Sequence, residues 1–566
     1  MQRRLAWTLV CACGALWAAS RALLQVALLA PAHWCREAHV DALAQQLPLA
    51  PEEVRQFAIP ALSSGVYSSC ERYSDDLVAA YIQWQRDHRP AARAQEAPVI
   101  TCDQGWHYNL SALPATITSE HNWVCTDRWK PTVIKIAYWL SAAGGSVIWM
   151  IIGNRYSKCF SLVFSLGVLL FGSILTMICT AFSTVLFAWI ILGCCQMAVM
   201  CLPISTVKEF SSSKTNCTLY HVAVCLTIWQ LSHIASLFVF FGVSPLLTSW
   251  WWLAAVLPPL STASLLLSVW CTWTILKKYK KELHLPLKSQ LGELSDDAVL
   301  YDVHFQKVTF QTRDCSLECM SEPDCKWRNY ILLAVYWLLC SWSYWMLVQT
   351  SPWLGANADA GEPSLSLTLN LFLAELPSCC YPALKLLLPN SVVVCRHSLL
   401  TMTVLLTLAP AASAATSLVN WVLYNKALMI EVCVSAVGHF GAMSALSMAR
   451  LLGLSRALHS SQSLIIWEPL GASLAALVEL IPEQRDTKML FLLVGIIATV
   501  ATLCAPSLSE YICCPIDVKQ NIFPPLWRKC RSSIIDSPLS QLFLVEKTES
   551  HTKYDSSLSY TPLQPG

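Results

Sequence analysis

The stretch from Cys102 to Lys158, CDQGWHYNLSALPATITSEHNWVCTDRWKPTVIKIAYWLSAAGGSVIWMIIGNRYSK, decides the fold. Its first part is polar and contains two cysteines and an N-x-S/T glycosylation sequon at Asn109. Residues 132–152 are mostly apolar, and a short basic loop at 153–158 follows them. This order predicts a membrane-spanning helix with an oxidising compartment on one side and the cytosol on the other.

The composition of the 566-residue chain also indicates a polytopic membrane protein. Hydrophobic residues make up 55% of the sequence and charged residues only 13%, and the mean hydropathy is +0.48. A soluble protein would carry roughly twice that share of charge. The net charge of +2 gives no reason to expect a nucleic-acid partner, so the lipid bilayer is the expected environment.

Twelve apolar runs have about the length that a bilayer requires. The first, at about 5–30, is interrupted by Arg21; we expect a retained helix, with a cleaved signal peptide as the alternative because Ala18, Ala19 and Ser20 are small. The others lie at about 132–152, 159–179, 185–206, 219–243, 250–276, 330–350, 365–388, 392–416, 427–449, 462–481 and 489–511. The expected divisions are a cytosolic start and first span (1–31), an extracellular domain (32–130), spans two to six (131–276), a cytosolic central loop (277–329), spans seven to twelve (330–511) and a cytosolic tail (512–566).

Basic residues in the short loops predict the orientation. In a twelve-span arrangement they all fall on one side: Arg155, Lys158, Lys208, Lys214, the lysine cluster at 277–281, Lys326, Arg328, Arg396, Arg450, Arg456, Arg528, Lys529 and Arg531. The opposite loops carry little charge or are acidic. Both termini are therefore expected in the cytosol, and residues 32–130 outside, with plasma-membrane localisation. A second sequon at Asn216 then lies on the cytosolic side and should stay unmodified.

The hydrophilic segment at 32–130 contains four cysteines, Cys35, Cys70, Cys102 and Cys125. An even number beside a sequon favours two disulfides in an extracellular, glycosylated domain. Three connectivities are possible. The alternative is four reduced thiols in a cytosolic loop.

Several motifs resemble those of the organic cation and anion transporters, solute carrier family 22 of the major facilitator superfamily. The segment beginning Pro31-Ala32-His33-Trp34-Cys35 and the later C-D-x-G-W-x-Y and W-V-C-x-x-x-W patterns carry this resemblance. It implies an all-α major facilitator fold of twelve transmembrane helices in two six-helix halves. A disulfide-bearing extracellular domain would lie between helices one and two.

The resemblance also implies candidate substrate-binding residues. Trp337 and Tyr344 match the seventh span, whose aromatic residues line the family's cavity, and Glu375 matches the eighth-span E-F-P motif. Glu468 falls where cation-transporting members carry an acidic residue. A carboxylate inside a span is a functional candidate by default, with pairing inside the bundle as the alternative for both glutamates.

Two further arguments concern these candidates. Trp337 and Tyr344 are seven residues apart and so share a helix face, which suits either cation recognition or ordinary packing. Gln230 in span five is a hydrogen-bonding candidate, with interhelical bonding as the alternative. Glu431 and His439 in span ten are candidates for carrying or sensing protons.

The gate motifs depart from the family pattern. The D-R-x-G-R-R turn between spans two and three is represented by Asn154, Arg155 and Lys158, without its acid, and Glu209 lies in the counterpart of the T-E-F loop after span four. Trp189 stands where the family has an arginine. In the family these motifs form cytosolic charge networks, so their loss weakens the expectation of ordinary alternating access.

The remaining motifs indicate neither an enzyme nor a cofactor. Three cysteines in the central loop, Cys315, Cys319 and Cys325, do not have the spacing of a standard zinc site. No phosphate-binding glycine loop or nucleophile elbow is present. We therefore expect a carrier of small organic ions, cations or zwitterions being favoured, driven by a gradient or facilitative. The alternative is a transport-inactive relative that acts as a receptor or assembly partner through its extracellular domain.

Overall fold

The structure is a computed structural model, and the part of the chain that it describes is almost entirely helical. The described residues are 2–31, 33–36, 59–62, 66–73, 99–110, 114–210, 218–243, 247–293, 323–350, 392–423, 428–457, 464–480 and 487–512. Eleven of the twelve predicted spans fall on helices in these ranges. The eighth, at about 365–388, lies outside the described residues, as does the tail from 513.

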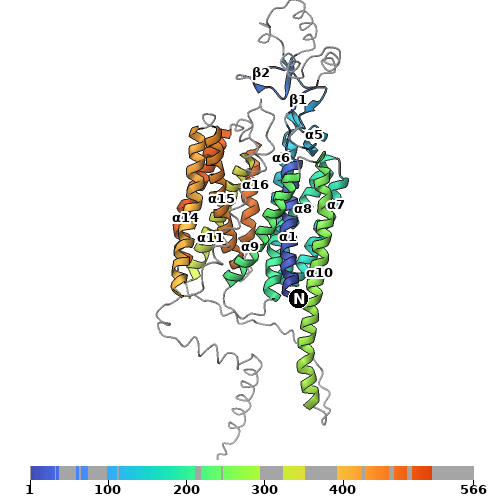
Figure 1. Ribbon diagram of the computed structural model, residues 1–566, viewed down its shortest axis with the longest axis vertical. Helices are drawn as coiled ribbons and strands as arrows, with labels where there is room; N and C mark the ends of the chain where they lie inside the picture. The colour runs from blue at the N-terminus through green and yellow to red at the C-terminus, as the bar shows by residue number, and fades with distance from the viewer. Residues whose placement is uncertain are drawn as a thin grey trace, which may run out of the picture. The chain divides into compact units, whose positions relative to one another are not determined.

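The helices form two groups (Figure 1). The amino-terminal half contains α1 (Gln2–Ala27), α6 (Trp129–Arg155), α7 (Lys158–Ile178), α8 (Phe182–Phe210), α9 (Thr218–Val243) and α10 (Trp251–Glu293). The carboxy-terminal half contains α11 (Pro323–Thr350), α14 (Val392–Leu423), α15 (Leu428–Ala457), the 3-10 turn η4 (Leu464–Ile466), α16 (Trp467–Val478) and α17 (Thr487–Ile512). Six described helices are long and apolar enough to cross a membrane: α1, α6, α7, α8, α10 and α11.

Packing within each half is closer than packing between them. α1 lies against α8, α9 and α10, and α11 lies against α15, α16 and α17. The main contacts between the halves are those of α6 with α16 and η4, and of α9 with α15. Two well-packed groups joined by a smaller interface are the arrangement expected of the major facilitator fold.

Glycines allow α6 and α8 to approach each other closely. A Cβ atom on Gly145 of α6 would meet the backbone of Cys194, and one on Gly193 of α8 would meet the backbone of Tyr138. The indole of Trp149 donates a hydrogen bond to the Cys194 carbonyl at 2.9 Å. Small residues at helix interfaces serve this purpose in membranes, where packing rather than water exclusion holds helices together.

Several helices extend beyond the predicted spans: α11 begins at Pro323 instead of 330, and α14 ends at Leu423 instead of 416. α10 continues to Glu293, beyond the predicted end at 276, because the segment that follows is rich in good helix formers such as lysine, leucine and glutamate. Arg450, which the prediction placed in a basic loop, lies inside α15 and is 1% exposed. The loop interpretation of Arg450 was wrong, because α15 continues to Ala457.

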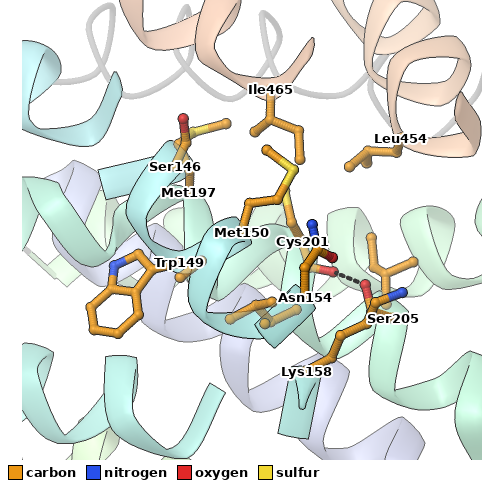
Figure 2. A pocket seen from close by; sticks show the side chains of 14 residues that line it. Ser146, Trp149, Met150, Asn154, Lys158, Met197, Cys201, Ser205, Leu454 and Ile465 are labelled. Atoms are coloured by element: carbon orange, nitrogen blue, oxygen red, sulfur yellow. Dashed lines mark hydrogen bonds between the residues drawn. The ribbon is translucent and has the colours of Figure 1, made fainter. Parts of the chain in front are cut away.

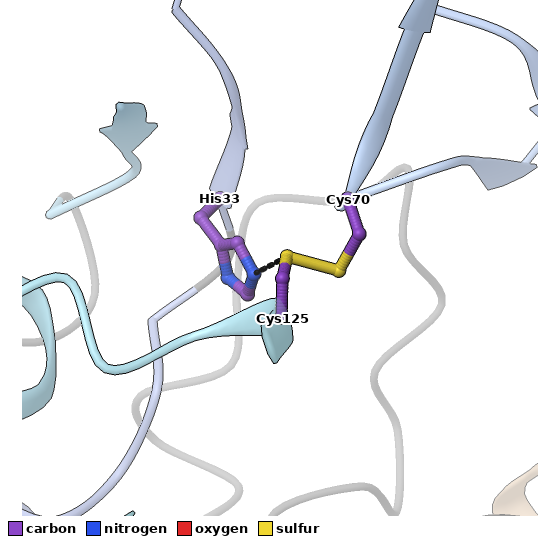
Figure 3. Close-up of side chains that lie close together, drawn as sticks. All are labelled: His33, Cys70 and Cys125. Atoms are coloured by element: carbon purple, nitrogen blue, oxygen red, sulfur yellow. Dashed lines mark hydrogen bonds between the residues drawn. A yellow bond between two sulfur atoms is a disulfide. The ribbon is translucent and has the colours of Figure 1, made fainter. Parts of the chain in front are cut away.

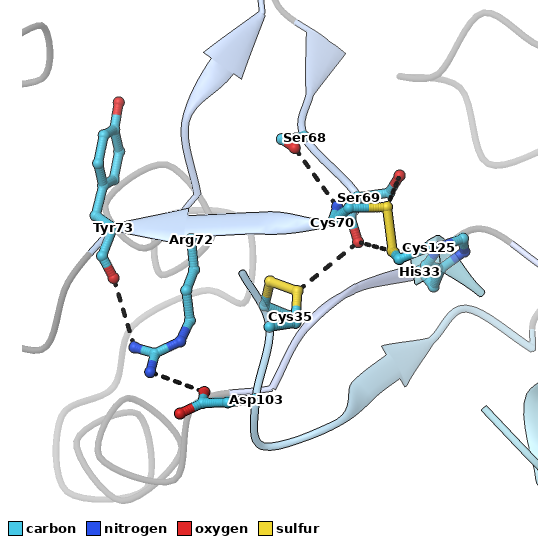
Figure 4. The surroundings of a disulfide bond; sticks show 10 residues. His33, Cys35, Ser68, Ser69, Cys70, Arg72, Tyr73, Asp103 and Cys125 are labelled. Atoms are coloured by element: carbon cyan, nitrogen blue, oxygen red, sulfur yellow. Dashed lines mark hydrogen bonds and ion pairs between the residues drawn. A yellow bond between two sulfur atoms is a disulfide. The ribbon is translucent and has the colours of Figure 1, made fainter. Parts of the chain in front are cut away.

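The extracellular domain contains short strands and two disulfides. Strand β1 (His33–Cys35) pairs with β6 (Trp106–Tyr108), β2 (Ala61–Leu62) pairs with β3 (Val66–Tyr67), and β4 (Glu71–Tyr73) pairs with β5 (Val99–Thr101), all antiparallel. The disulfides join Cys35 to Cys102 and Cys70 to Cys125, which resolves the three possible connectivities (Figure 4). Asn109 is exposed directly after β6.

His33 lies beside the second disulfide, with Nε2 at 4.0 Å from the Cys125 Sγ atom (Figure 3). Three potential metal ligands, His33, Cys70 and Cys125, therefore meet here. Both sulfur atoms are already joined in the disulfide, so they offer no thiolate to an ion. The group is a packing contact of the domain.

The base of the extracellular domain is attached to the amino-terminal half. The short helix α5 (Ile117–Glu120) is capped by Thr116, and its Glu120 carboxylate accepts hydrogen bonds from the Trp250 indole at 2.9 Å and the Ser249 hydroxyl at 3.1 Å. The Trp123 ring packs edge-on against Phe182, at the start of α8. Together these contacts fix the domain to the outer ends of α8 and α10.

Candidate functional site

Glu468 forms a buried ion pair inside the carboxy-terminal half. The Arg450 guanidinium donates to both carboxylate oxygens, from Nη2 at 2.6 Å and from Nε at 3.0 Å. The Trp337 indole donates to the same carboxylate at 3.3 Å. The two charged side chains are 1% and 0% exposed, so they neutralise each other without water. A paired arrangement of this kind avoids the large desolvation penalty of a lone buried charge.

The surroundings of Glu468 are close-packed. The Ser341 hydroxyl donates to the Glu468 backbone carbonyl at 2.6 Å. A Cβ atom on Gly453 would clash with the Trp337 ring, and one on Gly471 would clash with the α11 backbone. The cluster therefore joins α11, α15 and α16 into one unit. Glu468 is paired inside the bundle, which was one of the two roles that the sequence left open for it.

A second buried charge, Arg21, lies between the halves. It is in α1, is 2% exposed, and donates to the Tyr344 hydroxyl of α11 at 3.0 Å. Its guanidinium also lies 3.3 Å from Nε2 of His233 in α9 and 4.6 Å from the ring centroid of Trp345. Trp139 of α6 packs against Trp345 in a tilted arrangement, with ring centroids 4.4 Å apart and 56° between the ring planes. Arg21 thus contacts groups of both halves in the bundle interior.

Several neutral polar groups of the amino-terminal half are buried without a hydrogen-bond partner. Among the described residues these include both amide atoms of Gln196 in α8 and of Gln230 in α9, and the hydroxyl of Tyr138 in α6. All three side chains are at most 1% exposed. An unmade hydrogen bond costs about 1–3 kcal/mol at a buried site, so such groups call for a ligand or water.

An ion pair joins the two halves. It lies near the start of α6, which follows the extracellular domain, and directly after the end of α16. Nζ of Lys135 lies 3.0 Å from each carboxylate oxygen of Glu479. Thr132 adds a hydrogen bond to the same carboxylate at 3.4 Å. Both charged side chains are about a quarter exposed, at 23% and 26%, so the pair is hydrated and breakable. We call Lys135 and Glu479 the outer ion pair.

A small cavity lies near the opposite ends of these helices (Figure 2). Its volume is about 60 Å³, which is enough for a few waters and too small for an organic ion. Asn154 and Lys158 of the predicted gate line it, together with Cys201 and Ser205 of α8, and Leu454 and Ile465 of the other half close it. The turn itself is formed because the Ser157 side chain caps α7 at the Phe160 amide, at 3.0 Å.

The predicted gate has no ion pair in the part of the chain that the structure describes. Asn154 and Arg155 are exposed and Lys158 is half-buried, and no carboxylate lies within salt-bridge distance of either basic group. Glu209 lies in the last turn of α8. The two basic residues therefore stand without the charge network that the family motif would supply.

The predicted site residues do not form one cluster. Trp337 joins Glu468, whereas Tyr344, two turns later on α11, contacts Arg21 across the halves. Gln230 is buried on α9, one turn before His233. Glu375 lies outside the described residues. His439 is buried on α15, where its Nδ1 lies 2.9 Å from the Ser435 carbonyl, and Glu431 is on the same helix.

Sequence reasoning missed Arg21, His233 and Gln196. Arg21 was noticed only as an interruption of the first apolar run, although an ionisable residue inside a span is itself a signal of function. The partners of Arg21 are more than two hundred residues away in sequence, so no local pattern predicts them.

These observations define a multi-pass helical membrane protein of major facilitator type, with buried charges at and beside the interface of its two halves. The resemblance to solute carrier family 22 is confirmed by sequence similarity to named members of that family. Rabbit solute carrier family 22 member 1 is 22% identical over 343 residues, which are 58% of this chain and 59% of the relative. The Drosophila melanogaster carcinine transporter is 26% identical over 30% of this chain and 25% of its own length.

Further comparisons give weaker matches. The Drosophila melanogaster β-alanine transporter is 22% identical over 21% of each chain. The crystal structure of the human organic anion transporter MFSD10 aligns with 89% of this chain and 99% of its own, at 10% identity and a TM-score of 0.48. The chain thus spans less than two thirds of the curated relatives that it matches. No family model matches it.

Proposed function

We propose that the protein carries small organic ions across the plasma membrane, with both termini in the cytosol. The observation that supports this most directly is Arg21, a buried charge of α1 that contacts Tyr344 of the other half. A charge inside a bundle is costly and usually marks a substrate or ion pathway. The similarity to proteins named as transporters of carcinine and β-alanine agrees with this proposal.

The mechanism that we propose is rocking of one half against the other around a central site. In the conformation described here, the outer ion pair and the Arg21–Tyr344 hydrogen bond both join the halves. Opening toward the outside would break both contacts, and closing would restore them. The sequence contains no ATP-binding motif, so transport would be facilitative or driven by a gradient.

Glu468 is not part of this proposed binding site. Its carboxylate is fully occupied by Arg450 and Trp337, so it cannot select cations without first losing those bonds. We therefore assign it the role of holding α11, α15 and α16 together. The preference for cations that rested on Glu468 loses its basis, whereas zwitterions remain candidates.

Uptake into proteoliposomes tests the transport proposal. The purified full-length chain should show saturable uptake of at least one labelled probe among β-alanine, hippurate and tetraethylammonium, compared with liposomes without protein. Absence of uptake for all three, in protein shown to be folded by its thermal transition, would contradict the proposal.

A second function is favoured by the gate. Arg155 and Lys158 lack an acidic partner among the described residues, whereas the extracellular domain is held by two disulfides and fixed to α8 and α10. Such a chain could act as a receptor or assembly partner without moving solutes. Saturable protein binding that requires residues 32–130, with no uptake of the three probes, would support this function over transport.

A further inference from the structure

We infer that Arg21 is the anchor for the carboxylate of the substrate, and that Tyr344 holds the same guanidinium when the substrate is absent. This inference rests on the proposed transport function and deepens it, because it names the substrate class: organic acids and zwitterions with a free carboxylate. Guanidinium presents a planar fork of donors that fits a carboxylate with two parallel hydrogen bonds.

The position of Arg21 is the first argument. The described contacts of Arg21 come from two helices of different halves, namely His233 of α9 in its own half and Tyr344 and Trp345 of α11 in the other half. A substrate bound there would be held between the two parts that move. The Arg21 charge persists at any physiological pH, because arginine does not lose its proton in proteins.

The unpartnered polar groups are the second, independent argument. Gln230 lies one turn before His233 on α9 and so on the same side of that helix. Both its amide atoms and the Tyr138 hydroxyl lack a hydrogen-bond partner among the described residues, and both side chains are fully buried. Tyr138 precedes Trp139, whose ring contacts Trp345 beside Arg21. These groups can donate to or accept from a polar ligand held at Arg21.

The aromatic rings define the rest of the ligand. Trp139 and Trp345 are in tilted contact with ring centroids 4.4 Å apart, and Tyr344 packs edge-on against Trp345 at 5.4 Å. When the halves separate, Trp139 leaves with α6 and Trp345 with α11, because these helices belong to different halves. The exposed ring faces then suit an apolar or aromatic body next to the carboxylate. An aromatic acid fits this description best, and a small zwitterion fits its polar part.

Arg21 would bond to a different acceptor in each of the two states, the Tyr344 hydroxyl in the closed state and the substrate carboxylate in the open state. In the closed state the Tyr344 hydroxyl accepts from Arg21 at 3.0 Å. In the open state the substrate carboxylate takes its place and forms a stronger, charge-assisted bond. Substrate and Tyr344 therefore compete for the same donors, which predicts opposite effects of substitutions at the two positions.

Binding is measured with the purified full-length chain, separately from transport. The readout is the shift in thermal transition caused by hippurate, with hippuric acid amide as the neutral control and tetraethylammonium as the cationic control. We expect the wild-type protein to be stabilised by hippurate alone among the three. Arg21→Gln should weaken hippurate binding by at least about tenfold, and Arg21→Lys, which keeps the charge without the fork, by an intermediate factor.

Tyr344→Phe removes only the hydroxyl. Its expected effect is tighter binding of hippurate, which a folding defect would not produce. We expect this variant to bind hippurate about threefold to tenfold more tightly, because the competing acceptor is gone. Arg128→Gln, at an exposed arginine directly before α6, is the matched control and should leave binding unchanged. Hippurate binding that is equal in wild type and folded Arg21→Gln would overturn the inference, and so would weaker binding in Tyr344→Phe.

The outcomes separate this inference from the proposed function. Arg21-dependent hippurate binding without uptake in liposomes supports the carboxylate site and contradicts transport. Uptake of tetraethylammonium that survives Arg21→Gln, with no binding of hippurate, supports transport and overturns the carboxylate site. Neither binding nor uptake of any probe contradicts both.

Discussion

At the residue scale, the most informative side chains are two buried arginines with different partners. Arg450 is neutralised by Glu468 within one half, whereas Arg21 contacts Tyr344 of the other half. The first contact persists when the halves move as rigid groups, and the second cannot. This difference assigns Arg450 to stability and Arg21 to the working interface.

Glu468→Gln should destabilise the protein by about 3–5 kcal/mol, because Arg450 would remain charged and buried without its anionic partner. The measurement is the thermal transition of the purified chain in detergent. The double variant Glu468→Gln with Arg450→Met should recover part of this loss, since it removes the orphaned charge. A single variant with unchanged stability but reduced uptake of tetraethylammonium would instead indicate a ligand role for Glu468.

The Arg72–Asp103 pair predicts the pH response of the extracellular domain. The hydrogen bond from Arg72, 2.9 Å long, lowers the pKa of the Asp103 carboxyl below its ordinary value. A carboxyl with a lowered folded-state pKa contributes stability above its ordinary pKa of about 4, and this stability is lost as the pH falls through the lowered value. The contribution is therefore constant from neutral pH down to about 5 and disappears only in stronger acid.

Hydrogen exchange in strand β5 of the full-length chain measures this response. Asp103→Asn should exchange faster than wild type at pH 7 and at pH 5, by a similar and modest factor because Asp103 is largely exposed. The two proteins should become equal only when the pH falls below the lowered pKa of Asp103, where its carboxyl is protonated. A difference that grows as the pH falls would show that the sign of this linkage is wrong.

At the element scale, α6 and α16 form the seam that opens or stays closed. Their outer ends are joined by Lys135 and Glu479, whose opposite charges are in direct contact at 3.0 Å. Lys135→Glu should separate these ends because two carboxylates then face each other. Distances between spin labels at the exposed positions 129 and 480 should lengthen in this variant, and the charge swap Lys135→Glu with Glu479→Lys should restore the wild-type distance.

The elements themselves were largely predictable from sequence, and the site was not. Apolar runs such as 159–179 correspond closely to helices such as α7, because burying the backbone in lipid requires unbroken hydrogen bonding. The sequence prediction ended α10 too early. The apolar run ends at the lysine cluster at 277–281, whereas residues with good helix propensity continue beyond it. The role of Glu468 depended on Arg450, eighteen residues away on another helix, and its pairing required α11 to pack against both α15 and α16.

At the scale of the whole molecule, transport and receptor function differ in whether the halves must move. Replacing Lys135 and Glu479 by cysteines would place two thiols at the outer ion pair, and a bis-thiol reagent can span the distance that the two longer side chains bridge. Cross-linking should abolish uptake, whereas each single-cysteine variant treated with the same reagent should keep it. Binding of a protein partner to the extracellular domain should be the same with and without the cross-link. Uptake that continues in the cross-linked protein would contradict rocking at this seam.

The attachment of the extracellular domain has a consequence for how these two functions could coexist. In the part of the chain that the structure describes, Glu120 and Trp123 tie the domain to α10 and α8, which are helices of one half. The domain would then travel with that half during every cycle. A bound extracellular partner would be displaced relative to α16 each time a solute crosses, so solute flux would be converted into a mechanical signal at the cell surface.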